Sequence, residues 1–283
     1  MSKVIAAIDG SRSSASVSDH AAWASLRLGA PLALLHVVRT PHAEREADYS
    51  GNLIADTRQQ LLDEMVELEE QRNRLLREQG KLLLADVTER VKGQGLDEVE
   101  RLLRHGGITE NLNKLQEDAR LIVLGKQGKD GDMVERHVGS HLESLIRTLK
   151  TPILVASLEY RQPESFMIAY DGSATAQKVV DKVATSPLLK GLPAHILMVG
   201  EESKANQDKL TKAREQLIAQ GFEVRTAIRN GDVAEVMCSY RKEHDIHLMA
   251  MGAFGHSLLR RFFVGSTTTR MIMEAQMPLL ILR

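Results

Sequence analysis

Aromatic residues, cysteine and long apolar runs are all scarce in this chain of 283 residues. Phe, Trp and Tyr together make up 4% of it, and the one cysteine is Cys238. A lone cysteine forms no disulfide within the chain, which fits a reducing compartment. No apolar run approaches the ~20 residues that span a bilayer, and the apolar run at residues 4–8 is too short for the core of a signal peptide. We therefore expect a cytoplasmic protein.

An excess of charge of either sign is also lacking. Lys and Arg number 37 and Asp and Glu number 38, which gives a formal net charge of −1. Proteins that bind nucleic acid or anionic membranes usually carry an excess of basic residues, so neither partner is expected here. With 43% apolar residues, the chain is long enough to bury two ordinary cores.

Sequence motifs of catalysis are missing as well. The chain contains no G-x4-G-K-[ST] phosphate-binding loop, no G-x-G-x-x-G and no G-x-S-x-G. His244 and His247 flank Asp245 before an apolar strand, where alternation sends the two imidazoles to opposite faces. We therefore expect no catalytic residue and no metal site built from protein side chains alone. A bound nucleotide would be hydrolysed slowly at most.

What the chain does contain is an internal repeat. Residues 7–11, Ala-Ile-Asp-Gly-Ser, return as residues 169–173, Ala-Tyr-Asp-Gly-Ser, at a shift of 162 positions. Residues 118–125 match residues 245–252 at a shift of 127 positions. The chain is therefore a tandem duplication. The fall in the shift (162 minus 127) places a helical insertion in the first half, at about residues 41–95.

Short apolar runs alternate with segments of helical spacing, such as residues 13–28 and 108–119, in both halves. The apolar runs are residues 4–8, 32–38, 99–103, 121–124 and 153–155, and then 167–170, 196–199, 222–228, 248–251 and 279–282. Such an alternation is typical of parallel sheets covered by helices. The sequence predicts an α/β protein with two tandem doubly wound domains, residues 1–157 and 165–283. Each domain is expected to hold a five-stranded, mostly parallel sheet with helices on both faces.

The insertion is predicted to be a long helix. From Asn52 to Gln79 the sequence is rich in Leu, Glu, Arg and Gln, with apolar residues at 61, 65, 68 and 75 and with Arg72 between them. Gly80 is expected to end the helix, because glycine often follows the last turn. Its role stays open between cover for its own sheet, contact with the other half, and contact with a partner, which includes a homodimer.

A glycine-rich turn late in the second half is the strongest signal for a ligand. Gly252-Ala-Phe-Gly255 follows an apolar strand, and Gly265-Ser266 comes after nine further residues, at the start of a predicted helix. Glycine lets backbone N–H groups approach an anion closely, and a helix N-terminus favours negative charge. Ser266 or Thr267 would cap this helix and offer a hydroxyl group to a phosphate. A nucleotide is therefore the expected ligand.

Asp9 and Asp171 each follow the first strand of their half. Ligands of doubly wound sheets lie beyond the carboxyl ends of the strands, where the strand order reverses, so each aspartate is expected beside the glycine loop of its half. The alternative stays open that the glycines and aspartates only shape turns, since Asp-Gly-Ser is common in turns and caps. Ser11 and Ser173 are expected to be helix caps rather than nucleophiles.

These residues resemble the universal stress protein family over nearly all of both halves. The resemblance lies in the Asp-Gly-Ser after the first strand, the G-x2-G-x9-G-[ST] pattern and the closing Pro-Leu-Leu-Ile-Leu strand. It implies a domain that binds ATP or AMP in one branch of the family, and a related domain without nucleotide in the other branch. It also implies that the halves pair through the last strand of each, residues 153–155 and 279–282.

Carried over by position, the resemblance implies the following second-half site. Phosphates and ribose would be held by Gly252, Gly255, Gly265 and Ser266. Asp171 would lie near ribose or a bound Mg²⁺, and the backbone at Val199 would face adenine. His256 and Thr267 would reach the phosphates. ATP is the expected ligand, with AMP or ADP as alternatives and with Mg²⁺ as its accompanying ion.

The first half departs from the family pattern. Ten residues rather than nine separate Gly128 from Gly139-Ser140, and one extra residue re-aims the loop. We therefore predict a degenerate first-half site that consists of Asp9, Val37, Gly125, Gly128, Gly139 and Ser140. The second half is expected to be the better nucleotide site.

Together these patterns predict a tandem universal stress protein: a non-catalytic, ATP-binding regulator of the stress response whose halves pack as a pseudo-dimer. Two other functions stay open. One is an interaction protein of the same fold that binds another small ligand or a protein partner instead of nucleotide. The other is an enzyme that transfers an adenylyl group or cleaves ATP to release pyrophosphate.

Overall fold

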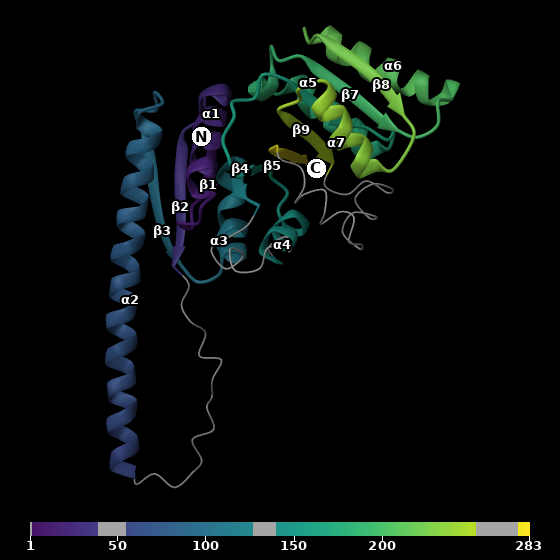
Figure 1. The fold of residues 1–283 in the computed structure, drawn as a ribbon. Coiled ribbons are helices and arrows are strands. Elements are labelled where there is room, and N and C mark those ends of the chain that lie inside the picture. The colour runs from purple at the N-terminus through teal and green to yellow at the C-terminus, as the bar shows by residue number, and fades with distance from the viewer. Residues whose placement is uncertain (1, 39–54, 127–139, 253–276) are drawn as a thin grey trace.

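The computed structural model describes residues 2–38, 55–126, 140–252 and 277–283 (Figure 1). Its strands are β1 Lys3–Ala7, β2 Leu32–Val38, β3 Val99–His105, β4 Ala119–Gly125, β5 Ile153–Ala156, β6 Phe166–Ala169, β7 Ala194–Val199, β8 Val224–Arg229, β9 Leu248–Gly252 and β10 Leu279–Leu282. Its α-helices are α1 Ser14–Leu28, α2 Ala55–Lys92, α3 Ile108–Leu115, α4 Ser140–Thr148, α5 Ala174–Thr185, α6 Lys204–Ala219 and α7 Val233–Glu243. Two short 3-10 helices are η1 Gln116–Asp118 and η2 Pro187–Leu189.

The strands of the described residues form one sheet, in the order β3-β2-β1-β4-β5-β10-β9-β6-β7-β8. Within each half the strands pair in parallel, and the strand order reverses between β1 and β4 and again between β9 and β6. The halves meet where β5 and β10 pair antiparallel, with Leu280 opposite Leu154. Each half is therefore a doubly wound, five-stranded parallel sheet, which confirms the predicted fold class.

Apolar side chains on the two faces of the sheet form two cores. Val4 and Ala6 of β1 belong to one core, whereas Ile5 belongs to the other, because successive residues of a strand face opposite sides. The first core includes residues of α1, α2, α5 and α6, and the second includes residues of α3, α4 and α7. Helices thus cover both faces, which is why the strands read as continuous apolar runs.

Hydrogen bonds to neighbouring elements shorten two of the predicted elements. The helix predicted over residues 108–119 ends at Leu115, and Ala119 already belongs to β4, where it pairs with Lys3 of β1. The strand predicted from residue 222 begins at Val224, because the Phe222 N–H donates to a carbonyl in the last turn of α6. Both boundaries depend on a partner that local spacing does not show.

The insertion forms one helix of 38 residues, α2, and the prediction that the helix ends at Gly80 is wrong. Gly80 is buried where α2 crosses β2 and β3. A Cβ atom at this position would lie 2.8 Å from His36 Cδ2 and 2.8 Å from Leu103 Cδ1. The glycine therefore lets the helix approach the sheet closely, rather than ending the helix.

The two parts of α2 have different surroundings. After Gly80, three side chains of the helix are buried against the sheet, namely Leu84, Val87 and Val91. Before it, residues 63–79 are mostly exposed, and the helix extends far beyond the edge of the sheet (Figure 1). Neither α2 nor any other helix of the described residues is both long and apolar enough to cross a membrane.

We expect Gly80→Ala to lower the free energy of unfolding by about 1 kcal/mol, because overpacking a core costs about 1–3 kcal/mol and the gain in helix propensity is only ~1 kcal/mol. The His36 ring cannot move away easily, since its Nδ1 donates to the Ile8 carbonyl at 2.6 Å. Urea unfolding measures the change. Glu89→Ala, at an exposed position of α2 outside residues 61–82, is the control and should change stability by less than ~0.5 kcal/mol. A Gly80→Ala protein as stable as the wild type would contradict the prediction, because it would show that His36 and Leu103 make room for a methyl group at no cost.

Candidate functional site

Three of the predicted second-half residues lie at the ends of neighbouring strands. Gly252 ends β9, Val199 ends β7, and Asp171 comes two residues after the end of β6. Because β6 lies between β9 and β7, these residues share one carboxyl edge, beside the point where the strand order reverses. Doubly wound sheets bind their ligands at this place.

Other predicted site residues lie outside the described residues, and their roles stay predictions. In the second half they are Gly255, His256, Gly265, Ser266 and Thr267, and in the first half they are Gly128 and Gly139. Ser140 is the first residue of α4.

Each Asp-Gly-Ser segment forms a tight turn. Asp9 and Asp171 each accept a hydrogen bond on Oδ1 from the N–H of the serine two residues on, at 2.9 Å in both halves. Gly10 and Gly172 have φ angles of 78° and 72°, a left-handed conformation in which a side chain is strained. Both segments therefore form turns, and each turn engages one carboxylate oxygen of its aspartate.

The serines after the two aspartates have different roles. Ser173 caps α5, because its Oγ accepts a hydrogen bond from the N–H three residues on at 3.1 Å, as predicted. The prediction that Ser11 caps α1 is wrong, since that helix begins at Ser14. The Ser14 Oγ accepts from the Gly10 N–H at 3.0 Å and donates to Asp9 at 3.1 Å, so it ties the helix to the turn.

The groups that cover the two turns also differ. A Cβ atom on Gly172 would lie 2.6 Å from Lys209 Cδ and 3.1 Å from its Nζ, so this exposed lysine of α6 passes directly over the second-half turn. A Cβ atom on Gly10 would instead lie 3.5 Å from a methyl group of Leu83 in α2. An ammonium group thus adjoins Asp171, whereas an apolar group adjoins the first-half turn. Sequence reasoning missed Lys209, because no motif marks it.

Gly252 has a packing role of its own. A Cβ atom here would lie 2.6 Å from Thr175 Cγ2, in the first turn of α5. The end of β9 therefore approaches the N-terminus of this 12-residue helix closely. Unpaired N–H groups and the positive end of the helix dipole are found at such a terminus. The half-buried Val199 lies on the other side of β6.

The first-half candidates lie on the opposite edge of the ten-stranded sheet. Asp9 follows β1, Val37 lies in β2, and Gly125 ends β4, with β1 between the other two strands. Because β5 and β10 are antiparallel, the carboxyl ends of the strands in the two halves point in opposite directions. The two candidate sites are therefore separate.

A buried lysine, Lys126, begins the first-half loop, where the second-half sequence has Ala253. Burial, together with the charge of Arg241 from the second half, lowers the pKa of Lys126 to about 8. Burial also lowers the pKa of His20 on α1 to about 4, and its ring stands edge-on to Tyr160, with the ring centres 4.8 Å apart. The first-half loop thus begins in a desolvated environment to which both halves contribute.

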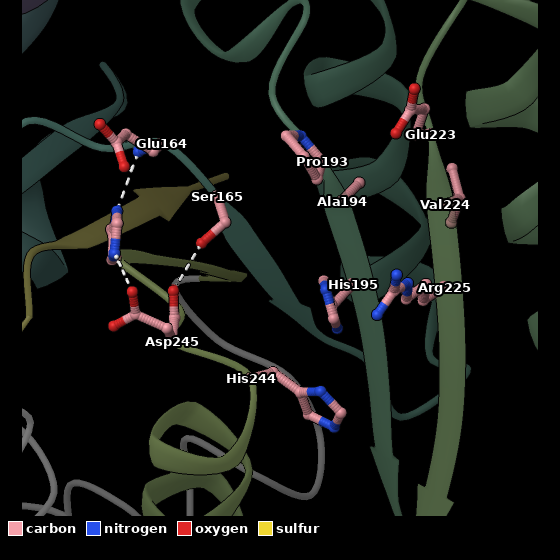
Figure 2. Close-up of a pocket in the computed structure, with 11 residues that line it drawn as sticks. Glu164, Ser165, Pro193, Ala194, His195, Glu223, Val224, Arg225, His244 and Asp245 are labelled. Atoms are coloured by element: carbon pink, nitrogen blue, oxygen red, sulfur yellow. Dashed lines mark hydrogen bonds and ion pairs between the residues drawn. The ribbon is translucent and has the colours of Figure 1, made fainter.

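A cavity of about 490 Å³ lies at the other edge of the second-half sheet (Figure 2). It is lined by Glu164, Ser165, Pro193, Ala194, His195, Glu223, Val224, Arg225, His244, Asp245 and His247. These residues surround the amino ends of β6, β7, β8 and β9. Since ligands of doubly wound sheets lie at the carboxyl ends, this cavity is not the predicted nucleotide site.

Hydrogen bonds fix one side of the cavity to the segment that connects the two halves. His247 Nδ1 accepts from the Glu164 N–H at 3.0 Å, and its Nε2 donates to Asp245 at 3.1 Å. Arg161 donates two hydrogen bonds of 2.9 Å to the same carboxylate. The guanidinium and His247 lower the pKa of Asp245 to about 2. This cluster holds the connecting segment against the start of β9.

Two further histidines, His195 and His244, also line the cavity (Figure 2). His195 Nδ1 shares a hydrogen bond of 2.9 Å with the Tyr240 hydroxyl, and the centre of the His244 ring lies 5.2 Å from that of His195. Burial lowers the pKa of His195, with smaller effects from nearby positive groups. Among residues that the structure describes, no three His, Cys, Asp or Glu side chains are grouped to hold a metal ion.

Comparison with known proteins identifies the family of this chain. The sequence model of the Universal stress protein family matches residues 1–157 and, again, residues 164–283. The chain belongs to this family. A curated member, universal stress protein Slr1230 of Synechocystis sp., is 31% identical over 290 residues, which cover 100% of both chains.

Solved structures extend the comparison of this universal stress protein to its fold. The crystal structure of a universal stress protein from Archaeoglobus fulgidus has a TM-score of 0.68 at 19% identity, over 99% of this chain and 96% of that one. A putative universal stress protein from Pseudomonas aeruginosa has a TM-score of 0.59 at 13% identity, over 99% of this chain and 92% of that one. Identities this low show a shared fold alone. The fold is therefore shared with these structures over nearly the whole chain.

We expect His20 to make the stability of this protein depend on pH. The unfolded histidine binds a proton below pH ~6.5, whereas the folded one does so only below about 4. Stability should therefore fall by about 3 kcal/mol as the pH drops from 6.5 to 4, and this effect should be absent above pH ~6.5. Urea unfolding between pH 7 and pH ~4.5 should show a weaker pH dependence for His20→Gln. The exposed His105→Gln is the control, and equal slopes for His20→Gln and wild type would contradict the prediction.

Proposed function

We propose that the second half of this universal stress protein binds ATP, and that the chain is a non-catalytic, cytoplasmic regulator of the stress response. The observation that carries the proposal is the second-half carboxyl edge. Val199 and Gly252 end β7 and β9 there, Asp171 follows β6 between them, and Lys209 passes over the turn between β6 and α5.

The chemistry of this edge suits a polyphosphate. Lys209 forms no ion pair with another described residue, so its ammonium group is available to an anion. The N-terminus of α5 adjoins Gly252, and the positive end of the helix dipole favours negative charge there. Gly172 and Gly252 are half-buried and add no side chain to this edge. A cationic side chain, a helix N-terminus and two glycines therefore coincide at one place.

The remaining parts of the nucleotide have candidate partners at the same edge. Asp171 shares its turn with Gly172, and a carboxylate here suits the Mg²⁺ that accompanies ATP. The backbone at Val199, on the far side of β6, is proposed to face adenine. Residues 255, 256 and 265–267 would complete the phosphate site. AMP or ADP would use the same contacts with fewer phosphates.

The first half is proposed to be the weaker site. Its turn is covered by Leu83, where the second half has Lys209, and its glycine spacing is one residue longer. We place the domains at residues 1–157 and 165–283, and the pairing of β5 with β10 supports a pseudo-dimer within one chain. Binding rather than turnover is proposed, because the sequence lacks the motifs of nucleotide hydrolysis. Nucleotide would act by changing a surface that a partner contacts.

Titration of ATP with Mg²⁺ should show one nucleotide per chain. Gly255→Val should weaken the affinity at least ~10-fold, because a branched side chain keeps the phosphate from the backbone. The matched first-half variant, Gly128→Val, should bind like the wild type. Isothermal titration calorimetry measures both, with thermal unfolding as the check on folding. Loss of binding in Gly128→Val alone would move the site to the first half.

Two other results of that titration would favour the alternatives. If a folded wild type does not bind ATP, the alternative of an interaction protein with the same fold is favoured. Steady release of pyrophosphate or AMP would indicate an enzyme.

Lys209→Ala should weaken ATP binding about 10-fold, since one charge-assisted contact to phosphate is worth roughly 1–3 kcal/mol. Lys212→Ala removes an equally exposed charge from the same helix and is the matched control. The difference between the two variants should shrink at high salt, because the lysine is exposed to solvent. Equal affinities of Lys209→Ala and Lys212→Ala would show that the phosphates do not lie at this turn.

A further inference from the structure

Exposed apolar side chains gather on the projecting helix. Eight large apolar side chains are exposed in the part of the chain that the structure describes, and five of them belong to α2, namely Met65, Val66, Leu68, Leu75 and Leu82. Leu68, Leu75 and Leu82 are 64%, 71% and 72% exposed. Scattered surface leucines need no explanation, but a row of them on one helix marks an interaction surface.

The row follows the spacing of a coiled coil. Leucine recurs at every seventh position, at 61, 68, 75 and 82, with Met65, Arg72 and Gln79 between them at alternating intervals of four and three. These are the d and a positions of a heptad repeat. The run from residue 61 to residue 82 is ~32 Å long. We call it the leucine stripe.

The leucine stripe stays accessible where α2 packs on its own domain. Leu82 lies two residues from Gly80 and two from Leu84, both of which face the sheet, so it points roughly 160–200° away from them. The described residues of the second half do not reach the stripe, because α2 lies beside β2 and β3, at the end of the sheet farthest from them (Figure 1). The stripe from Met65 to Leu82, where the structure describes the side chains, is therefore open to another molecule.

Charge divides the same helix into two segments. Residues 63–70 contain five acidic and no basic residues, whereas residues 72–81 contain four basic residues and one acidic residue. That acidic residue, Glu78, pairs with Lys81 of its own helix at 2.8 Å. A helix with this division is complementary to a second copy that runs in the opposite direction.

The direction of pairing follows from this charge division. In an antiparallel pair with its two-fold axis near residue 71, each acidic segment lies beside the basic segment of the other copy. A parallel pair would place the two acidic segments together and the two basic segments together. Like charges in such positions repel, so the antiparallel arrangement is favoured. A lone helix of this composition is also marginal in water, and a partner would stabilise it.

We propose that the chain forms a homodimer in which residues 61–82 of α2 pair with the same residues of a second copy as an antiparallel coiled coil. This surface is separate from the proposed nucleotide site, which lies in the other half. Two copies joined in this way would hold their globular parts at opposite ends of the paired helices. Self-association therefore does not require nucleotide.

Sedimentation equilibrium of the full chain tests the proposal. We expect the wild type to be dimeric and the double variant Leu68→Glu, Leu75→Glu to be monomeric, with the dissociation constant raised at least ~100-fold, since buried carboxylates lack partners. The double variant Leu26→Glu, Ile218→Glu changes two exposed apolar residues on α1 and α6 and should stay dimeric. Thermal unfolding checks that both variants fold, and ATP affinity should be equal in both. A monomeric wild type or a dimeric stripe variant would overturn the proposal.

Cross-linking tests the direction of the helices. In a Cys238→Ser background, chains with Met65→Cys or Gln79→Cys are treated with a short bismaleimide, alone and mixed. Antiparallel pairing brings position 65 near position 79 of the partner and keeps like positions ~20 Å apart, so only the mixture should cross-link efficiently. Efficient cross-linking of each variant alone would show parallel helices and would overturn the antiparallel arrangement.

Discussion

The hydrogen bonds between β5 and β10 determine how the two halves are arranged. Both strands are buried, and each would leave a row of backbone groups unpaired at the edge of its sheet without the other. Their antiparallel pairing turns two parallel sheets into one and continues both cores across the junction, with Leu154 and Leu280 in one core and Ile153 and Ile281 in the other. It also inverts the second half relative to the first, so that the parallel strands of the two halves run in opposite directions. The carboxyl edges, where ligands are expected, therefore face in opposite directions.

This arrangement separates the surfaces to which we assign functions. The proposed nucleotide edge belongs to the second half, the buried Lys126 begins the first-half loop, and the leucine stripe lies at the far end of the sheet. The duplicated turns also differ in chemistry, because Lys209 covers one and Leu83 covers the other. After duplication, identical Asp-Gly-Ser turns have thus come to lie under side chains of opposite character. The backbone geometry of the turn is the same in both halves, whereas its affinity for an anion need not be.

Glycines show how far local reasoning extends. Asp-Gly-Ser is typical of turns, and the positive φ angles of Gly10 and Gly172 show that both segments form them. Gly80 was predicted to end a helix and instead lies inside one, because His36 and Leu103 leave no space for a Cβ atom. Gly252 likewise makes room for another residue, because a Cβ atom there would collide with Thr175. A glycine that bends the chain can be recognised from its neighbours in sequence, but a glycine that makes room for a distant residue cannot.

Local periodicity and the internal repeat were sufficient to predict the fold class, the duplication, the strands and the presence of a long helix in the insertion. These features depend on residues that are close together in the sequence, so their pattern is visible without a structure. The hydrogen bonds that tie Ser14 to the turn before α1, the end of α3 at Leu115 and the lysine above Gly172 were decided by contacts that local spacing does not show. The sequence by itself thus determined which elements form and which edge of each sheet is suited to a ligand. Only the tertiary structure decided which side chains cover that edge and which face of α2 stays open, because both depend on residues brought together by packing.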